Sequence, residues 1–222
     1  MSDPQNAASA AAEAARYALL RRLAPSMRHH LVVNLQPIGM VYEIMDRRLR
    51  APQPDYAEVK EGAHKISGYA RAALASCIDV VTWLAPEHSA RCTAEQGIAE
   101  VLSLIATGFT FRGFSLRDQG GEVAGEVRRG AFRNVVTGAF LWLSDEHAAP
   151  AQITIRAEKT NEALVVALAL GPADGDPPVG TPPSYRRLTW ADVQALAAAD
   201  DVQVAREGSS LRISLPWALA SA

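Results

Sequence analysis

The chain has 222 residues, of which 49% are hydrophobic and 21% are charged, and its formal net charge is −2. This length can bury one or two sizeable cores, and the near-neutral charge argues against a nucleic-acid-binding protein. No apolar run approaches the roughly 20 residues that span a bilayer, and the first residues lack the basic and apolar parts of a secretory signal. Cys77 and Cys92 are too few for a disulfide framework, and no His/Cys cluster suggests a metal site. We therefore expect a globular, cytoplasmic protein that uses no membrane, nucleic acid, metal or cofactor.

The first long segment, about residues 6 to 49, is rich in alanine, leucine, arginine and methionine, which favour helix. With Leu31 as position a of a heptad, its a, d and e positions form one largely apolar seam, typical of a packed helix. The seam residues are Ala24, Met27, Leu31, Asn34, Leu35, Ile38, Val41, Tyr42, Met45 and Leu49. Pro25 predicts a break with a second helix starting there, and Pro37 predicts a kink, because proline lacks the N–H that bonds the preceding turn.

Two adjacent histidines stand in the middle of this helix. His29 falls at heptad position f, diametrically away from the seam, whereas His30 falls at g, on the flank of the seam. His29 is therefore expected to face solvent. Exposed histidines on helical bundles are usually no more than solvated side chains, so this alternative stays open. Arg21, Arg22 and Arg28 precede His29 on the same helix, and their charge would suit an acidic partner.

A second helix follows a turn at residues 51–55, where two prolines stop the first helix and Asp55 can cap the next one. To about residue 84 its apolar residues alternate by fours and threes, as expected of a helix that packs antiparallel against the first. These residues are Val59, Ala63, Ile66, Ala70, Ala73, Cys77, Val80 and Leu84. Because Ile78, Val81 and Trp83 remain beside this seam, we expect a second copy to complete a dimeric four-helix bundle. His64 is expected to be a solvated surface residue.

After Pro86 the sequence pattern changes to short helices and strands. The expected helices are 93–106, 126–143 and 190–199, and the expected strands are 110–117, 152–157, 163–170, 202–205 and 211–215. The chain is therefore predicted to be α+β: a helical-hairpin domain at residues 1–86, followed by an α/β sandwich at residues 87–222. The Gly/Pro-rich stretch Gly171 to Ser184 is expected to be a long loop.

This order of parts resembles the dimerisation and catalytic core of sensor histidine kinases and of the histidine phosphotransferases related to them. Some subfamilies carry the pattern His-x-x-x-x-Asn-Leu-Gln, and counting from His29 gives Asn34, Leu35 and Gln36, with an apolar Leu31 at plus two. Counting from His30 matches nothing. The resemblance implies that His29 is a phosphoacceptor and that His30 stands where some subfamilies carry an orienting acidic residue. It also implies a homodimer whose Arg21, Arg22, Arg28 and Gln36 meet receiver domains of response regulators.

The second half resembles the ATP-binding domain of the same family but departs from its pattern. The stretch Phe132 to Phe140 is similar to the helix that carries the nucleotide-binding asparagines; Asn134 takes the first of these positions, and Gly138 stands where the family has the magnesium ligand. Asp174 follows a predicted strand without the family's Asp-x-Gly-x-Gly spacing. ATP needs a magnesium ligand, free backbone amides at the phosphates and a specific base contact. We therefore predict a degenerate domain that binds neither ATP nor metal.

Two functions follow from these observations. The first is a two-component phosphorelay protein that moves phosphoryl groups between His29 and receiver aspartates, because a neutral imidazole can attack a phosphoryl group for which the receiver supplies the magnesium. The second is a catalytically inactive relative that acts as a scaffold or regulator of a signalling partner. The replacement of the acidic neighbour by His30 favours the second function, and the exposed place of His29 favours the first. An active ATP-dependent kinase is expected in neither case.

Overall fold

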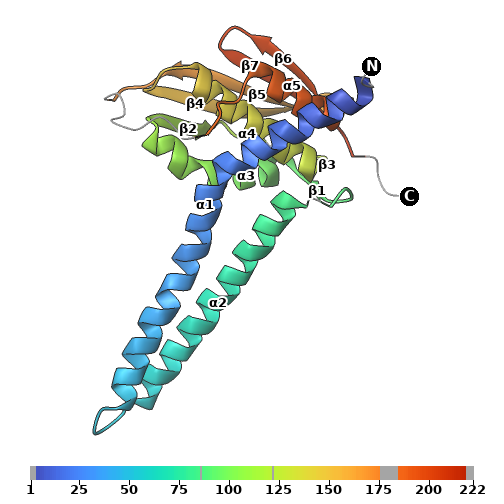
Figure 1. The fold of residues 1–222 in the computed structure, drawn as a ribbon. Coiled ribbons are helices and arrows are strands. Elements are labelled where there is room, and N and C mark those ends of the chain that lie inside the picture. Colours follow the sequence, from blue (N-terminus) through green and yellow to red (C-terminus); the bar gives the residue numbers. More distant parts are fainter. Residues whose placement is uncertain (1–3, 86, 122, 176–184, 219–222) are drawn as a thin grey trace. The chain divides into compact units, whose positions relative to one another are not determined.

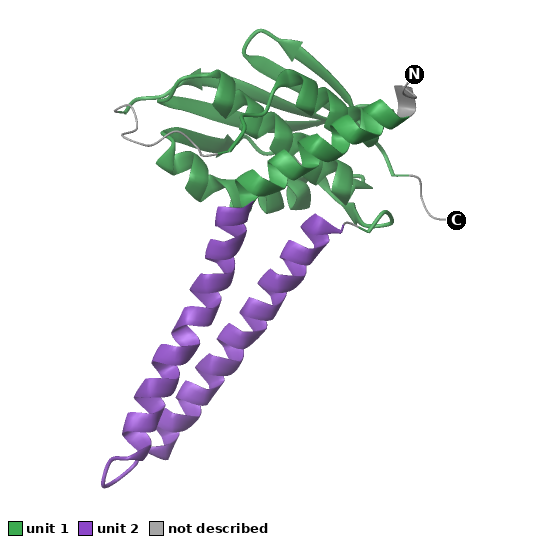
Figure 2. Cartoon of the chain, in the orientation of Figure 1, with its two compact units in different colours: residues 1–23, 86–222 green, residues 24–85 purple. Residues whose placement is uncertain are grey.

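A computed structural model describes residues 4–85, 87–121, 123–175 and 185–218. The chain forms two compact units (Figure 2). One, here called the α/β unit, comprises Met1–Leu23 and Pro86–Ala222, and the other, the hairpin unit, comprises Ala24–Ala85. The sequence division placed residues 1–86 together, whereas by contact the first 23 residues group with the α/β unit. No helix in the described ranges is long and apolar enough to cross a membrane.

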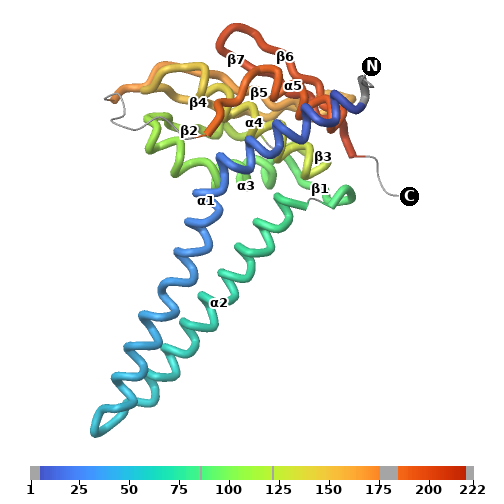
Figure 3. The backbone as a smooth tube through the Cα atoms, viewed as in Figure 1, coloured from blue at the N-terminus to red at the C-terminus, as the bar shows by residue number. Residues whose placement is uncertain are grey.

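Two long helices run antiparallel in the hairpin unit (Figures 1 and 3). Helix α1 spans Pro4–Leu49, and helix α2 spans Tyr56–Leu84. Asp55 caps α2, its carboxylate accepting from the backbone N–H groups of Ala57 at 2.8 Å and Glu58 at 3.2 Å. The predicted break of α1 at Pro25 is wrong, because the helix continues through both Pro25 and Pro37. Good helix formers surround both prolines, so the ladder continues past each missing N–H. Pro25 instead lies close to the junction of the two units.

The two helices of the hairpin approach most closely near its tip. A Cβ added to Gly62 would lie 2.6 Å from the Sδ of Met45, so the side chain of Met45 packs directly against the backbone of α2 at this glycine. Farther along, the Nδ2 of Asn34 donates to the Oγ of Ser76 at 3.1 Å. The predicted antiparallel pairing of the two helices is therefore confirmed.

The predicted seams need correction at several positions. On α1 the a and d positions from Met27 to Met45 are buried or half-buried, but Ala24 is exposed and the e positions Leu35 and Tyr42 are 52% and 62% exposed. On α2 the inward positions include Gly62, Tyr69 and Ser76, each one residue before the apolar residue that the pattern favoured. Glycine, tyrosine and serine therefore occupy inward places for which the apolar pattern gives no signal. Four residues that the pattern predicted to be buried are exposed instead: Ala63, Ala70, Cys77 and Leu84.

The α/β unit is built on a five-stranded sheet with the order β2-β4-β5-β7-β6. Its strands are β2 Phe114–Asp118, β4 Ala151–Lys159, β5 Ala163–Pro172, β6 Gln203–Glu207 and β7 Ser210–Pro216. Only β2 and β4 pair in parallel; the remaining neighbours are antiparallel. A second, two-stranded sheet joins β1 Arg91–Cys92 to β3 Val127–Arg128. The mixed sheet with its helices confirms the predicted α+β class.

Helices α3 Ala94–Phe111, α4 Arg129–Glu146 and α5 Trp190–Ala199 lie along one face of the large sheet (Figure 1). The core forms where the alternating side chains of the strands meet these helices: Ile155 pairs with Leu168, which pairs with Leu211, and all three are buried. Phe132 and Phe140 of α4 are also fully buried, and the ring of Phe140 lies edge-on to Phe109 of α3. The predicted strand at 110–117 begins later, because α3 continues to Phe111 and β2 starts at Phe114.

Candidate functional site

His29 lies on α1 in the hairpin unit with an exposed side chain, as its heptad position predicted. His30 is half-buried, and its ring centre lies 6.3 Å from that of His29, with 52° between the ring planes. No hydrogen bond joins the two rings, both of which belong to the described part of the chain. His29 therefore presents an imidazole to solvent without a fixed hydrogen-bonding neighbour, and His30 does not orient it by direct contact.

The turn of helix that follows the histidines is fixed to the other helix. The Nδ2 of Asn34 donates to the backbone carbonyl of His30 at 3.0 Å and to the Oγ of Ser76 on α2 at 3.1 Å. Since residues advance about 100° around a helix, His29 points away from the side that carries Asn34. Gln36 lies seven residues, or about two turns, beyond His29 and is exposed on the same side, and Arg28 is exposed next to it. These three side chains form one accessible surface on α1.

Arg21 and Arg22, which the sequence grouped with Arg28, belong to the α/β unit. Arg22 is engaged inside the chain: its two terminal nitrogens lie 2.7 and 3.0 Å from the carboxylate oxygens of Asp145, and the two side chains are 5% and 1% exposed. Arg21 lies beside the ring of Tyr185, with its guanidinium carbon 4.8 Å from the ring centre. Arg22 therefore has an internal role in place of the partner contact expected of it.

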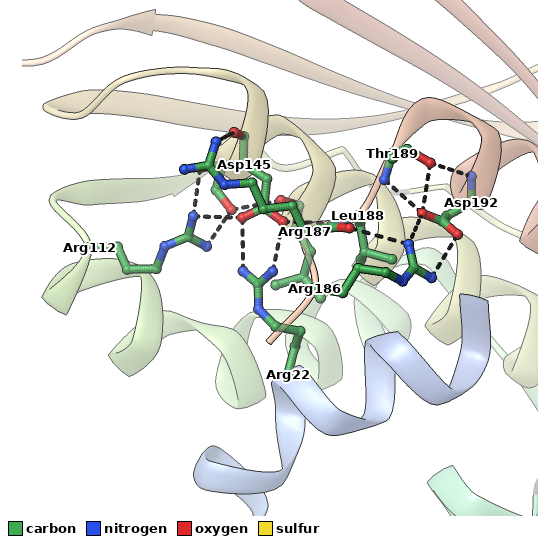
Figure 4. A network of polar contacts seen from close by, with 10 residues as sticks. Arg22, Arg112, Asp145, Arg186, Arg187, Leu188, Thr189 and Asp192 are labelled. Carbon is green, nitrogen blue, oxygen red and sulfur yellow. Dashed lines mark hydrogen bonds and ion pairs between the residues drawn. The ribbon is translucent and has the colours of Figure 1, made fainter. Parts of the chain in front are cut away.

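Asp145, in the last turn of α4, is the centre of a polar network that joins four segments (Figure 4). Besides Arg22 of α1, its carboxylate accepts from Arg112, at the end of α3, at 2.8 Å and from the backbone N–H of Leu188 at 3.0 Å. Arg112 also donates to the hydroxyl and carbonyl of Ser144 at 2.8 and 2.7 Å. This network connects Arg22 of α1 and the segment before α5 to the ends of α3 and α4.

The pKa of Asp145 reflects two opposed influences. Burial is the largest single influence and raises the pKa, because it disfavours the charged form. The hydrogen bond and charge of Arg22, with smaller contributions from the Leu188 amide and the charge of Arg112, together outweigh burial and hold the pKa below its ordinary value. Asp145 is therefore ionised at neutral pH.

The N-terminal segment, defined here as residues 6–23 of α1, packs on helices α4 and α5. Its buried residues are Ala12, Ala15, Ala18, Leu19 and Leu23. At Gly138 of α4 an added Cβ would lie 2.7 Å from the Cδ1 of Leu196 and 3.8 Å from the Cδ1 of Leu19. The place where the resemblance expects a magnesium ligand is therefore filled by apolar side chains, one of them from the N-terminal segment.

Asn134, the other residue of the degenerate nucleotide site, also has a partner within the chain. Its Nδ2 donates to the carboxylate of Asp200 at 3.3 Å, and Arg16 of the N-terminal segment lies 3.4 Å from the same oxygen. Asp174 lies exposed in the loop after β5. Residues 176–184 of the predicted loop Gly171 to Ser184 lie outside the described residues. Asn134, Gly138 and Asp174 therefore form no joint site in the described part of the chain.

Sequence reasoning did not single out Asp145 or Arg112. A signal for Asp145 exists, because a carboxylate in the last turn of a helix lies at the unfavourable, negative end of the helix dipole. Such a placement indicates compensating cations, and here two arginines provide them. Which arginines these are depends on tertiary packing, since Arg22 lies 123 residues away in the chain.

No protein-family model matches the sequence, and no curated protein matches it. Solved structures do match. The histidine kinase AdeS of Acinetobacter baumannii is 10% identical, with 83% of this chain and 98% of that chain covered and a TM-score of 0.43. A histidine kinase from Burkholderia phymatum is 15% identical, with 91% and 98% covered and a TM-score of 0.43.

A third match is a bacterial phosphotransferase, 10% identical, with 89% of this chain and 95% of that chain covered and a TM-score of 0.39. These solved structures are histidine kinases and a phosphotransferase, the same classes of protein that the sequence resembles. With TM-scores below 0.5, they support no conclusion about activity. The order of parts expected of a histidine-kinase-like core, two long helices followed by an α/β sheet, is present in this chain itself.

Proposed function

We propose that this chain is a histidine phosphotransfer protein of a two-component signalling system. His29 takes a phosphoryl group from the aspartate of one receiver domain and gives it to another, without ATP. The observation that carries the proposal is the exposed imidazole of His29 on a helix whose other side is tied to α2 by Asn34. A rigid helix holds the nucleophile still while one side remains open to a visiting protein.

The chemistry requires only the imidazole from this chain. The lone pair of the unprotonated ring nitrogen attacks the phosphorus of the receiver's acyl phosphate, so an N–P bond forms as the O–P bond breaks and the aspartate leaves as a carboxylate. The other ring nitrogen then releases its proton to solvent. The receiver supplies the magnesium that neutralises the charge on the phosphoryl oxygens, and transfer to the next receiver reverses these steps.

The surface around His29 suits a receiver, whose phosphorylation site is rich in carboxylates. Arg28 adds a positive charge next to His29, and Gln36 adds hydrogen-bonding groups two turns along the same side of α1. Charge complementarity of this kind speeds association more than it strengthens the final complex. Arg28 is accordingly assigned to docking and His29 to chemistry.

The proposal excludes ATP as the phosphoryl donor because of the surroundings of Gly138 and Asn134. Leu196 and Leu19 fill the space beside Gly138, and Asp200 holds Asn134. Gly138 therefore supplies no magnesium ligand, and the side-chain amide nitrogen of Asn134 is already bonded within the chain. Any phosphoryl group on His29 would then have to come from another protein.

The proposed protein acts as a dimer, because the hairpin unit leaves one broad apolar face uncovered. On α2, Leu74, Val81 and Leu84 are 60%, 59% and 60% exposed. On α1, Val32 and Leu35 are 46% and 52% exposed. Exposed apolar side chains gathered on one face of a soluble protein mark an interaction surface.

Helix geometry places both sets of side chains on the same side of the hairpin. Each follows by one position a residue that faces the partner helix, as Leu74 follows Ala73 and Val32 follows Leu31, so each is turned by about 100° from the seam. Because the helices run antiparallel, these turns lead to the same side. A second copy related by a two-fold axis presents the same face and would complete a four-helix bundle.

A second candidate function has its own supporting observation. No carboxylate contacts His29 among the described residues, so the ring lacks a carboxylate partner that could orient it or accept its proton. A protein with this site could bind a signalling partner through the same surface without exchanging phosphoryl groups. The two functions predict the same complex and differ in whether the phosphoryl group moves.

The test is incubation of the full-length protein with a panel of receiver domains carrying labelled acyl phosphate. Phosphotransfer predicts that at least one receiver loses label to this chain faster than it loses label to water. Binding without transfer predicts a stable complex in which the receiver keeps its label. Retention of label by every receiver in the panel would leave only the second function standing.

A further inference from the structure

We propose that the α/β unit binds a small aromatic anion in a pocket between the N-terminal segment of α1 and the residues just before α5. The pocket has a volume of about 360 Å³ and is lined by Ala14, Tyr17, Ala18, Arg21, Tyr185 and Arg186. All six residues belong to the same compact unit. Small-molecule sites in proteins typically have volumes of about 300–1,000 Å³, so the pocket suits a ligand of about one ring.

Arg21 supplies the anion-binding group of this pocket. Its contacts are with aromatic side chains: its guanidinium carbon lies 4.8 Å from the ring centre of Tyr185, and its Nη1 lies 3.5 Å from the hydroxyl of Tyr17. No carboxylate pairs with Arg21 in the described residues. With no carboxylate to satisfy it, the guanidinium of Arg21 can offer its N–H groups to two oxygens of a carboxylate or phosphate.

Of the two arginines that line the pocket, only Arg21 lacks a carboxylate partner among the described residues, and the next arginine along α1 is paired as well. Arg22 pairs with Asp145 at 2.7 Å, and Arg186 pairs with Asp192 at 2.6 Å. Arg186 lines the same pocket, but its charge is already compensated. The pocket therefore offers one uncompensated positive charge, which favours a ligand with a single anionic group over a polyanion such as a nucleoside triphosphate.

The remaining walls select an apolar, planar body. Ala14 and Ala18 contribute small apolar side chains to the lining of the pocket, and Ala18 is only 8% exposed. Tyr17 and Tyr185 also line the pocket, and aromatic rings attract another ring in stacked or edge-on arrangements. Their hydroxyl groups can also donate to the oxygens of the anion. The ligand class is therefore a single aromatic ring that carries one carboxylate or phosphate.

The experiment uses the full chain and four probes measured by calorimetry and ligand-observed NMR. Benzoate and phenyl phosphate carry both features, benzyl alcohol lacks the charge, and inorganic phosphate lacks the ring. We expect saturable binding of at least one of the first two, and at least about tenfold weaker binding of the last two, because a charge-assisted bidentate contact and ring stacking are each lost. Comparison of benzoate with phenyl phosphate identifies the anionic group.

Variants then locate the binding site. Arg21→Gln and Tyr185→Ala should each weaken binding by about tenfold or more. Arg117→Gln is the matched control, because Arg117 is an exposed arginine of β2 and lies outside the pocket, and it should bind as the parent protein does. Unchanged affinity in Arg21→Gln, binding of benzyl alcohol as tight as that of benzoate, or no binding of any probe would overturn the proposal. Circular dichroism of each variant verifies that it is folded, which the exposure of Arg21 leads us to expect.

Discussion

The buried carboxylate of Asp145 is the residue on which the attachment of the N-terminal segment depends. It lies at the end of α4 that repels negative charge, and Arg22, Arg112 and the amide of Leu188 compensate for that position and for burial. Removing one member of such a cluster leaves the others buried and unpaired, which costs more than the net contribution of the intact cluster.

Asp145→Asn is therefore expected to lower the free energy of unfolding by about 3–5 kcal/mol at neutral pH. Asp174→Asn, an exposed position in the same unit, is the control and should change it little. Denaturant unfolding followed by circular dichroism measures both. Equal stability of the two variants would show that the Asp145 network does not hold the segment.

The stability that Asp145 provides should depend on pH in one direction. Its pKa is lower in the folded chain than in the unfolded chain, so its contribution is fully present above the unfolded value of about 3.9 and is lost as the pH falls through the lower folded value. The difference in unfolding free energy between the parent and Asp145→Asn should therefore be constant from about pH 5 to 7 and shrink below about pH 4. A difference that grows on acidification would contradict this assignment.

A substitution at Gly138 tests whether the chain can accommodate the magnesium ligand that the resemblance expects at this position. Gly138→Asn supplies the side chain that the histidine kinase resemblance expects, but a Cβ there already lies 2.7 Å from the Cδ1 of the buried Leu196. Overpacking of this kind costs about 1–3 kcal/mol. Gly39→Asn is the matched control, since nothing lies within 4 Å of its Cβ position, and it should be close to neutral. A Gly138→Asn protein as stable as the parent would mean that the α4–α5 contact adapts.

At the scale of elements, α2 illustrates what sequence periodicity reveals and what it misses. The alternation by fours and threes correctly identified a long helix that packs against α1. It could not tell which of two neighbouring stripes faces inward, because Gly62 and Ser76 carry no apolar signal, yet Gly62 contacts Met45 and Ser76 accepts from Asn34. Part of the apolar stripe that the sequence predicted to face α1 faces outward instead, and the proposed dimer would cover it.

Ala70 and Ala73 separate these two roles of α2. Ala73 is 4% exposed and faces α1, whereas Ala70 is exposed on the apolar face. Ala73→Glu should unfold the hairpin, because an unpaired buried charge costs several kcal/mol. Ala70→Glu should leave helix content unchanged and dissociate the dimer. Sedimentation and circular dichroism give both results, and a parent protein that is monomeric at micromolar concentration would refute the dimer.

The N-terminal segment was the element least accessible to sequence reasoning. Its composition correctly predicted helix, and α1 runs through it without interruption. Its packing on α4 and α5 follows from Leu19 beside Gly138 and from Arg22 at Asp145, which are contacts between distant parts of the chain. Apolar periodicity predicts that a helix has a buried face but not which element covers it.

At the scale of the whole molecule, the chain has a histidine-kinase-like order of parts, and its N-terminal segment packs beside Gly138 and Asn134, the positions that the resemblance assigns to nucleotide binding. Titration of ATP with magnesium in a calorimeter should therefore give no saturable heat up to about 1 mM ATP, which corresponds to a binding free energy no stronger than about −4 kcal/mol. Micromolar affinity would mean that the segment leaves its place or that nucleotide binds elsewhere.

The central claim is that His29 carries the phosphoryl group, and mass mapping of that group tests it most directly. After incubation with a phosphorylated receiver, peptides prepared at alkaline pH should show one added phosphoryl group on the peptide that contains His29. The label should disappear in His29→Ala and persist in His64→Ala, an exposed histidine on α2, and in His30→Ala, since the two adjacent rings make no hydrogen bond. Full labelling of the His29→Ala protein would contradict the account.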